Sequence, residues 1–280
     1  MSIETGVLYV VATPLGNRKD VSLRAVEVLR AVDLIAAEDT RHSRPLMHHL
    51  GIETPLLAMH EHNERQMADR LIPRLRAGES IALISDAGTP LISDPGFPLV
   101  RECHRQGVRV CPIPGPSAAV CALSAAGLPT DRFRFEGFPA RTPTARREQF
   151  EALRRETATL VFYESSHRIT DCLADMSLQF GPQRPAVLAR ELTKLHETIV
   201  HATLGDLCDR LAADPLQRKG EFVILLAGAQ KDSRLSAETE RILRLLMKEL
   251  PLKQATLLAA RITGEKKNRL YQQALDWQQG

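Results

Sequence analysis

Aromatic residues are scarce in this chain of 280 residues, where one Trp, three Tyr and eight Phe make up 4% of the sequence. Proteins that bind single-stranded nucleic acid without sequence preference usually stack bases on grouped aromatic side chains. Such few and scattered aromatic residues do not predict a stacking platform. Charge of one sign is equally scarce. The 37 Lys and Arg exceed the 34 Asp and Glu by three, an excess too small to indicate a nucleic-acid partner by itself.

Cysteine is rare as well, and no two cysteines form a C-x-x-C pair. An odd number of widely spaced cysteines predicts reduced, buried thiols in a cytosolic protein and no zinc site. His60 and His62 lack the i, i+4 spacing of a helical zinc pair, so their segment predicts substrate contact or capping by Asn63 rather than metal binding. We expect no bound metal. The five cysteines are Cys103, Cys111, Cys121, Cys172 and Cys208.

Long hydrophobic runs are also missing. No uninterrupted apolar stretch approaches the roughly 20 residues that span a bilayer. The segment Met1–Gly6 shows no basic region followed by an apolar run, so it does not predict a signal peptide. With 44% hydrophobic and 25% charged residues, the composition excludes a disordered or fibrous chain. We therefore expect a soluble, cytoplasmic protein with no membrane partner.

Short apolar, β-branched runs alternate with segments of helical periodicity through most of the chain. This alternation predicts an α/β protein with mostly parallel or mixed sheets. We expect strands at 7–12, 34–37, 81–85, 108–113, 135–138, 160–163, 186–190 and 222–227. We expect helices at 22–31, 41–50, 61–77, 95–106, 116–126, 144–155, 167–179 and 203–213.

The strongest internal break is the run Ile113-Pro114-Gly115-Pro116-Ser117. Two prolines around a glycine end a strand, and Ser117 can cap the helix that follows. We predict that an N-terminal α/β domain, 1–113, ends here and that a C-terminal α/β domain, 114–230, begins. Strands then cease, and 231–280 is expected to be a helical module with helices at 236–250, 252–263 and 266–279. This last segment holds ten Lys and Arg against six Asp and Glu, so it carries the positive excess.

Three turns rich in Gly and Pro follow predicted strands, at 13–17, 86–96 and 114–118. Each one alone is best explained as an ordinary tight turn. Because ligands bind outside the carboxyl ends of the strands in an open α/β sheet, three such turns together predict a site for a flat, adenosine-sized ligand. The chain has neither G-x-x-x-x-G-K-[ST] nor G-x-G-x-x-G after its first strand, which argues against an NTPase and a Rossmann dehydrogenase.

An ordered set of motifs resembles the tetrapyrrole-methylase-like family, a class of S-adenosylmethionine (SAM)-dependent methyltransferases distinct from the Rossmann-like one. The resemblance covers essentially the whole chain and is closest to members that act on small-subunit ribosomal RNA. The motifs are V-A-T-P-L-G-N (11–17), A-E-D-T-R-H (37–42), H-E-H-N-E (60–64), S-D-A-G-T-P-L-I-S-D-P-G (85–96), P-G-P-S-A (114–118), F-Y-E-S-S-H-R (162–168) and A-R-E-L-T-K (189–194).

The resemblance implies a class III methyltransferase, in which two α/β domains hold SAM in the cleft between them, and a homodimer. It implies methylation of the ribose 2′-hydroxyl of a cytidine in the decoding region of 16S rRNA, with the small ribosomal subunit as partner. It also implies cofactor contacts from the three turns and from two later strand ends. These cofactor residues are Pro14, Leu15, Gly16, Asp86, Ala87, Gly88, Thr89, Pro90, Ser117, Ala118, Phe162, Tyr163 and Phe222.

Methyl transfer to a ribose hydroxyl needs alignment above all, and a general base or a cation would assist the weakly acidic hydroxyl. In the segment after the second strand, Asp39 could cap a helix and leave Arg41 solvated. Alternatively, Glu38 or Asp39 could orient Arg41 or the ribose at the cleft.

Two later strand ends also place a carboxylate near a cation, with Glu164 in one and Glu191 beside Lys194 in the other. Structural ion pairs are an equally good explanation of both. We expect the base to be Asp39, Glu164 or Glu191, with Arg41 and Lys194 as electrostatic partners.

The basic tail resembles a small helix-turn-helix-like module. We expect Lys253, Lys266, Lys267 and Arg269 to contact RNA phosphates, although a solvated helix face is the alternative. Arg141, Arg146 and Arg147 could extend this surface.

Two other functions of the protein remain open. One is SAM-dependent methylation of a small molecule or a protein side chain, for which the tail has no evident use. The other is non-catalytic RNA binding, against which the three turns argue.

Overall fold

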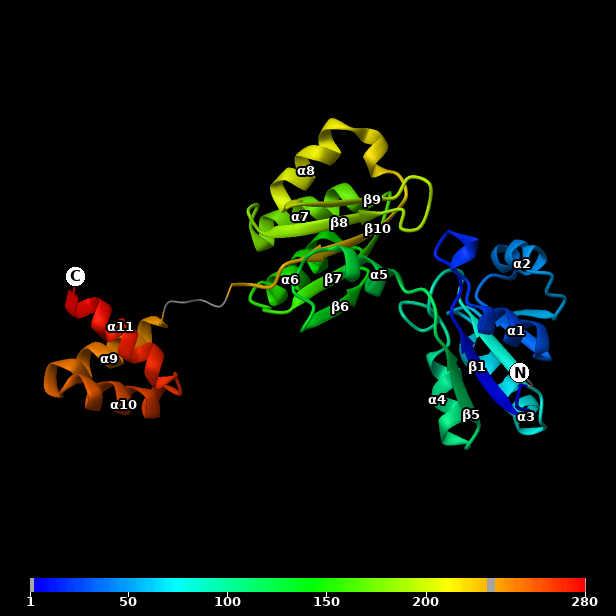
Figure 1. The fold of residues 1–280 in the computed structure, drawn as a ribbon, viewed down its shortest axis with the longest axis horizontal. Helices are drawn as coiled ribbons and strands as arrows, with labels where there is room; N and C mark the ends of the chain where they lie inside the picture. The colour runs from blue at the N-terminus through cyan, green and yellow to red at the C-terminus, as the bar shows by residue number, and fades with distance from the viewer. Residues whose placement is uncertain (1–2, 231–234, 280) are drawn as a thin grey trace. The chain divides into compact units, whose positions relative to one another are not determined.

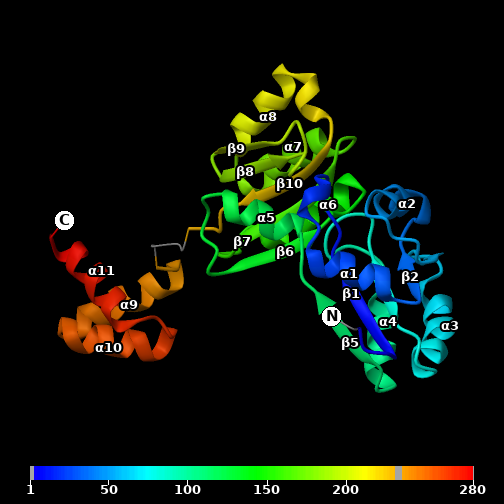
Figure 2. The ribbon, with the colours of Figure 1, turned by 45° about the vertical axis from the view of Figure 1, so that its right-hand side comes forward.

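The computed structural model describes residues 3–230 and 235–279, with the backbone alone at residue 279. The described residues up to Ala229 form one compact unit, and those from Gln230 onward form a second. Both units are drawn in Figures 1 and 2. Among the described residues, no helix is long and apolar enough to cross a membrane.

The first sheet is entirely parallel, with the strand order β3-β2-β4-β1-β5. Its three central strands, β2, β4 and β1, are apolar and almost entirely buried, as is typical of a sheet covered by helices on both faces, whereas the edge strands β3 and β5 are only partly buried. Helices α1 and α2 pack on one face, and α3 and α4 on the other. The elements are β1 (Val7–Val11), η1 (Arg18–Asp20), α1 (Leu23–Ala31), β2 (Leu34–Ala37), α2 (Thr40–His49), β3 (Leu56–Ala58), α3 (Glu64–Arg76), β4 (Ile81–Ile84), α4 (Phe97–Arg105) and β5 (Arg109–Ile113).

The second sheet is mixed, with the strand order β6-β7-β10-β8-β9. Only β6 and β7 pair in parallel, whereas β10 pairs antiparallel with both β7 and β8, and β9 pairs antiparallel with β8. The elements are α5 (Ala118–Ala125), β6 (Phe133–Gly137), α6 (Pro143–Leu153), β7 (Thr159–Ser165), α7 (Ile169–Phe180), β8 (Pro185–Arg190), β9 (Thr198–Thr203), α8 (Leu204–Ala213), η2 (Pro215–Arg218) and β10 (Glu221–Leu226).

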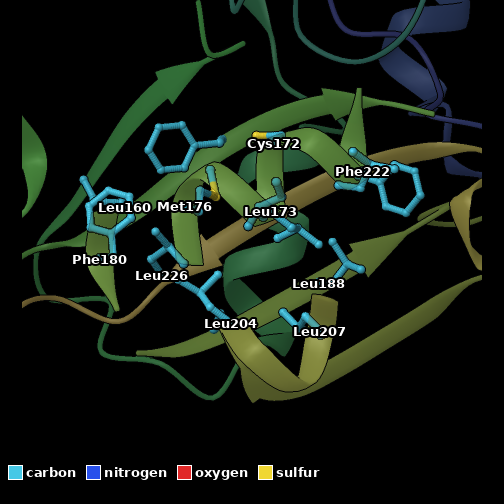
Figure 3. Packing of buried hydrophobic residues seen from close by; sticks show 14 of the residues in the cluster. Leu160, Cys172, Leu173, Met176, Phe180, Leu188, Leu204, Leu207, Phe222 and Leu226 are labelled. Atoms are coloured by element: carbon cyan, nitrogen blue, oxygen red, sulfur yellow. The ribbon is translucent and has the colours of Figure 1, made fainter. Parts of the chain in front are cut away.

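Two apolar clusters cover the two faces of the second sheet. Helix α5 packs on one face, against Val161, Val187 and Val223. Helices α6, α7 and α8 cover the other, where Phe162 meets Phe150 edge to face at 5.7 Å. Figure 3 shows this second cluster, with Cys172, Leu173 and Met176 of α7 among its labelled residues. Successive residues of β7 therefore point to opposite cores.

The second unit consists of the helices α9 (Ala237–Glu249), α10 (Leu252–Thr263) and α11 (Lys267–Gln279). Its small core includes Leu235, Leu243, Ala259 and Leu270. Gly264 ends α10 in the left-handed conformation, where glycine has no Cβ to clash. The three helices predicted for this segment are confirmed.

The α/β class and the predicted strands and helices are confirmed, with boundaries that differ by up to three residues. Two strands were not predicted, β3 and β9. The first has only three residues, and the second is a half-exposed edge strand with few apolar side chains. The prediction of mostly parallel or mixed sheets is confirmed, since the first sheet is parallel and the second is mixed, with three of its four pairs antiparallel. These three pairs are antiparallel because β8 leads directly into β9 without a crossover helix, and β10 inserts between the mutually parallel strands β7 and β8.

Candidate active site

The three Gly/Pro turns meet at one edge of the first sheet because β4, β1 and β5 are neighbouring parallel strands. The amide of Thr13 donates a hydrogen bond to Gly88 O at 2.8 Å, and the Gly88 amide donates back to Thr13 O at 3.1 Å. The Thr89 hydroxyl donates to Pro116 O at 2.8 Å. The turns therefore support one another as a single structure.

Two glycines permit this close approach. Gly88 has a φ of +85°, and a Cβ there would stand 3.2 Å from Leu15 Cδ2. A Cβ at Gly115 would stand 2.9 Å from the Cβ of Ala12. A Cβ at Gly115 would push its turn away from Ala12, and a side chain at Gly88 would strain the backbone at this positive φ, so both positions favour glycine.

One cavity of about 430 Å³ lies between this edge and the second sheet, and we call it the acidic cavity. It combines three carboxylates at one end with aromatic rings and a helix N-terminus elsewhere. Its lining includes Glu38, Asp86, Ala87, Gly88, Thr89, Ile92, Ser93, Asp94, Ser117, Ala118, Phe138, Tyr163, Ser165, Glu221 and Phe222.

Burial and neighbouring negative charge raise the pKa of two carboxylates in the acidic cavity, Asp94 and Glu38. Burial raises the pKa of Asp94 to about 7, with further contributions from the negative charges of Glu38 and Asp86. Burial also raises the pKa of Glu38, although its carboxylate accepts a hydrogen bond from the Asp86 amide at 3.3 Å. Sequence reasoning missed Asp94 as a site residue. The sequence feature that could have identified Asp94 is its position in the same Gly/Pro turn as Asp86.

An aromatic group forms the other wall. The ring of Tyr163 packs edge to face against Phe135 at 4.9 Å and Phe138 at 5.7 Å. Its hydroxyl accepts a hydrogen bond from the Ala119 amide at the start of α5, at 3.1 Å. Burial raises the pKa of Tyr163, so this phenol stays neutral. It fixes the second sheet to the turn that follows β5.

A second cavity of about 450 Å³, which we call the basic cavity, adjoins the first. The two share Asp86, Ala87 and Glu221 in their walls. Four basic side chains make this cavity chemically different from its neighbour. Its lining also includes Thr13, Pro14, Leu15, Gly16, Arg18, Arg41, His42, Ser43 and Lys194.

Asp39 and Arg41 form an ion pair at the edge of the basic cavity. The Asp39 side chain caps α2 by accepting from the Arg41 amide at 2.8 Å, and it also accepts two hydrogen bonds from the Arg41 guanidinium. These bonds hold the pKa of Asp39 at about 2. Asp39 therefore both caps the helix and orients Arg41, but so weak a base would accept a proton poorly.

Lys194 joins two carboxylates beside the same cavity. Its Nζ lies 3.0 Å from Glu191 Oε1 and 3.0 Å from Glu221 Oε2. Burial alone would raise the pKa of Glu191, but the Glu221 amide and Lys194 outweigh it and hold that pKa below its usual range. Glu191 lines neither cavity. Glu221, which the sequence did not single out, reaches the site because β10 begins at this edge.

Glu164 points away from the aromatic wall although it borders the acidic cavity. Its side chain has no exposed surface, and it lies 3.3 Å from the Arg168 guanidinium. Burial raises the pKa of Cys172 on α7, and the neighbouring Glu164 raises it further. Strand alternation puts Glu164 on the opposite face of β7 from Tyr163. It therefore forms a buried ion pair at the border of the acidic cavity.

Most of the sequence-predicted cofactor residues border one of the two cavities, and two do not. Phe162 lies in the core beneath α7 because it shares a face of β7 with Glu164. Pro90 is buried in its turn and lines neither cavity. The sequence could not separate Phe162 from Tyr163, since a continuous apolar run does not reveal which residue faces which side.

The basic residues singled out outside the cavities differ in exposure. Lys253, Lys266 and Lys267 are exposed, whereas Arg269 is half-buried and bonded to Glu265 at 3.0 Å. The suggestion that Arg146 extends an RNA surface is wrong, because it is buried and binds Asp175. Arg147 reaches the same carboxylate. Arg141 is exposed.

Two family models together match most of the chain. Residues 7–208 match tetrapyrrole (corrin/porphyrin) methylases, and residues 233–278 match the RsmI C-terminal HTH domain. The chain therefore belongs to the tetrapyrrole methylase family.

Curated relatives define the group more narrowly. A protein of Pseudomonas aeruginosa is 56% identical over 99% of both chains, and one of Escherichia coli O157:H7 is 53% identical over 98% of this chain and 96% of its own. Both are named ribosomal RNA small subunit methyltransferase I. Within the family, the chain belongs to this methyltransferase group, which confirms the resemblance seen in the sequence.

Solved structures show the same fold at low sequence identity. A diphthine synthase gives a TM-score of 0.60 at 18% identity, covering 79% of this chain and 90% of that one. A uroporphyrin-III-C-methyltransferase from Thermus thermophilus gives 0.55 at 23% identity, covering 79% and 94%. At these identities the likeness concerns the fold alone.

Proposed function

We propose that the protein uses SAM to methylate the ribose 2′-hydroxyl of a cytidine in the decoding region of small-subunit (16S) rRNA. The observation that carries the proposal is the pair of adjoining cavities, one acidic and aromatic, the other basic, with Asp86 and Ala87 in the wall between them. The names of the curated relatives support the rRNA substrate. The 2′-oxygen and the cytidine rest on the resemblance of the motifs.

The acidic cavity fits SAM in size and in chemistry. Its volume of about 430 Å³ is in the usual range for a small-ligand site. The carboxylates of Glu38, Asp86 and Asp94 suit a ligand that carries a sulfonium and an ammonium charge. The rings of Tyr163, Phe138 and Phe222 suit a flat, apolar base. We propose that Gly88 and Thr89, Ser117 and Ala118 complete this site.

When bound, SAM supplies an electrophilic methyl group on a positively charged sulfur. The chain's own contribution is alignment: the rigid set of turns at Thr13, Gly88 and Pro116 fixes the common wall of the two cavities. Asp86 is held in that wall by the Asp39 amide, which donates to its Oδ1 at 3.1 Å. The ribose oxygen would approach from the basic side.

Charge develops on the ribose oxygen as its proton leaves, and we propose that Lys194 and Arg41 stabilise it. Both line the basic cavity, and both are held by carboxylates. Of the proposed bases, Asp39 and Glu191 are engaged by cations, and Glu164 is fully buried and paired with Arg168. The proton of the ribose hydroxyl is better accepted by the carboxylate group of the acidic cavity that includes Asp86 and Asp94.

We further propose that the protein acts in the cytoplasm as a homodimer and that the basic tail binds rRNA. The family resemblance supports the dimer. The match to an HTH domain model supports the role of the tail. Light scattering on the purified protein would give the subunit number directly.

The deciding experiment is methyl transfer from labelled SAM to small ribosomal subunits isolated from a strain that lacks this gene, followed by nucleoside mapping. Label in 2′-O-methylcytidine is the expected result. SAM binding without label in rRNA would overturn the rRNA substrate. It would favour the alternative substrates, a small molecule or a protein side chain. Absence of SAM binding would overturn the cofactor as well.

A further inference from the structure

Helix α2 carries an unusually one-sided set of charges. Between Thr40 and His49 it holds two arginines and three histidines, and it contains no acidic residue. Arg41, His42, Arg44, His48 and His49 are all exposed. Ser43 and Met47 form the buried side of the helix, toward the first sheet. The basic side chains are thus presented outward while the rest of the helix is anchored.

This face borders an open groove of about 570 Å³. The groove is lined by Arg18, Arg41, Arg44, Pro45, His48 and His49. Arg18 comes from η1, which directly follows the first Gly/Pro turn. A lining of cations and imidazoles from two elements, with no acidic member, matches a chain of phosphates.

The groove continues into the basic cavity, since Arg18, Arg41 and Pro45 belong to both linings. The basic cavity in turn shares Asp86 and Ala87 with the acidic one. A continuous track therefore leads from the exposed face of α2 to the proposed reaction centre. All of it lies within the first unit.

Two cations of the groove are available for an external anion. Arg41 is engaged by Asp39, whereas neither Arg18 nor Arg44 has an ion pair with any residue that the structure describes. A surface arginine without an ion-pair partner is solvated by water or binds an external anion. A polyanion that lay along the groove would be their partner.

We propose that the groove along α2 holds the backbone phosphates that flank the target nucleotide of an RNA strand, with Arg18 and Arg44 as the main phosphate contacts. This inference rests on the proposed function, because it supplies the path by which the target ribose reaches the basic cavity. It also assigns RNA binding to the first unit, separately from the basic tail.

The test replaces both arginines in the full-length protein, as Arg18→Gln/Arg44→Gln. Binding of small ribosomal subunits from the deletion strain is measured by filter retention over a series of KCl concentrations. The matched control is Arg65→Gln/Arg70→Gln, which removes the same charge from two exposed positions of α3 outside the groove. Thermal unfolding and SAM binding by calorimetry check that the fold and the cofactor site are intact.

We expect the groove variant to bind subunits about tenfold more weakly than wild type at moderate salt. The slope of log Kd against log salt should become shallower by about 1 to 2, one contact for each arginine. The control variant should match wild type. A groove variant that binds with wild-type affinity and salt slope would overturn the proposal, whatever its methylation activity.

Failure of the proposed function gives a different pattern. If wild-type protein transfers no methyl group to the subunits, the proposed reaction is wrong, while the binding measurement still decides the groove. If wild type methylates the subunits and the groove variant binds normally, the reaction stands and the groove inference falls.

Discussion

The aliphatic part of Lys194 lies directly on Gly16, in the space that a Cβ at Gly16 would occupy. Beside this contact, the Asn17 amide donates to the Thr193 hydroxyl at 3.2 Å. A loop after β1 and a loop after β8 thus meet, although 176 residues separate Asn17 from Thr193. Glu191 and Thr193 hold positive φ angles of 52° and 66°, which are uncommon for residues with a side chain. Such strain is tolerated where surrounding contacts impose it.

The substitution Gly16→Ala should move Lys194 off this loop. The Gly16 backbone can accept alanine, because its φ is not in the left-handed region, so the loss should come from the contact alone. We expect a decrease in unfolding free energy of about 1–3 kcal/mol, measured by urea denaturation. In a Lys194→Ala background the same substitution should cost much less. An equal cost in both backgrounds would contradict the role of this contact.

Replacing the Lys194 ammonium should slow methyl transfer more than it weakens SAM binding. If Lys194 stabilises charge on the ribose oxygen, Lys194→Met should lower kcat by about a hundredfold. The SAM dissociation constant should stay near that of wild type. Lys194→Arg keeps the positive charge and should retain more activity. Single-turnover kinetics and calorimetry separate the two effects, and a variant with normal kcat would exclude the role.

The folded protein should lose stability as pH rises toward neutrality because of Asp94. Its pKa rises from 3.8 to about 7 on folding, so between these values the folded state keeps a proton that the unfolded chain releases. The stabilisation is complete below about pH 4 and is lost as pH rises through about 7. Asp94→Asn should therefore be more stable than wild type at pH 8, on the order of 1 kcal/mol because partial exposure screens the charge.

The comparison needs urea denaturation at pH 5 and pH 8, where the advantage of Asp94→Asn should be smaller at the lower pH. The exposed Asp69 of α3 offers a matched control, and Asp69→Asn should change stability little at either pH. A pH-independent effect of Asp94→Asn would show that the carboxyl is not titrating in this range.

Removing the buried carboxylate of Asp175 on α7 should lower the free energy of unfolding strongly. Asp175 lies 2.5 Å from the Arg146 guanidinium, and these side chains are only 6% and 5% exposed. Asp175→Ala would leave that guanidinium without a counter-ion, so we expect a loss of about 3–5 kcal/mol in urea denaturation. Arg147 binds the same carboxylate but is 51% exposed, and Arg147→Gln should cost at most about 1 kcal/mol. Equal losses of unfolding free energy in the Asp175→Ala and Arg147→Gln variants would mean that burial does not determine the strength of these ion pairs.

The exposed lysines at the start of α11 should contribute to rRNA binding but not to SAM binding. The double substitution Lys266→Gln/Lys267→Gln should weaken subunit binding by about three- to tenfold and reduce its salt dependence. The matched control is Lys248→Gln on α9, also exposed. Calorimetric SAM affinity should be unchanged in all variants. Subunit binding that is insensitive to both lysines would assign them to an ordinary solvated helix face.

The parts of the site that could be predicted from the sequence were those marked by a pattern within a few consecutive residues. The three turns were found because Gly and Pro follow apolar runs at once in the sequence. Asp39 was correctly considered as a helix cap, since capping depends on a few consecutive residues. Glu221 was missed because only the insertion of β10 between β7 and β8 brings it to Lys194.

The sequence by itself determined the helices, every strand except β3 and β9, the three-helix tail and the family, since periodicity, turn residues and motifs are all read along the chain. Only the tertiary structure decided that Tyr163 lines the acidic cavity while Phe162 packs into the core on the opposite face of β7. It alone buried Arg146 against Asp175 and joined the groove of α2 to the basic cavity. The physical reason is that burial, ion pairing and cavity shape depend on which distant segments pack together. Strand pairing decides which segments these are, and a local sequence pattern does not reveal how strands pair.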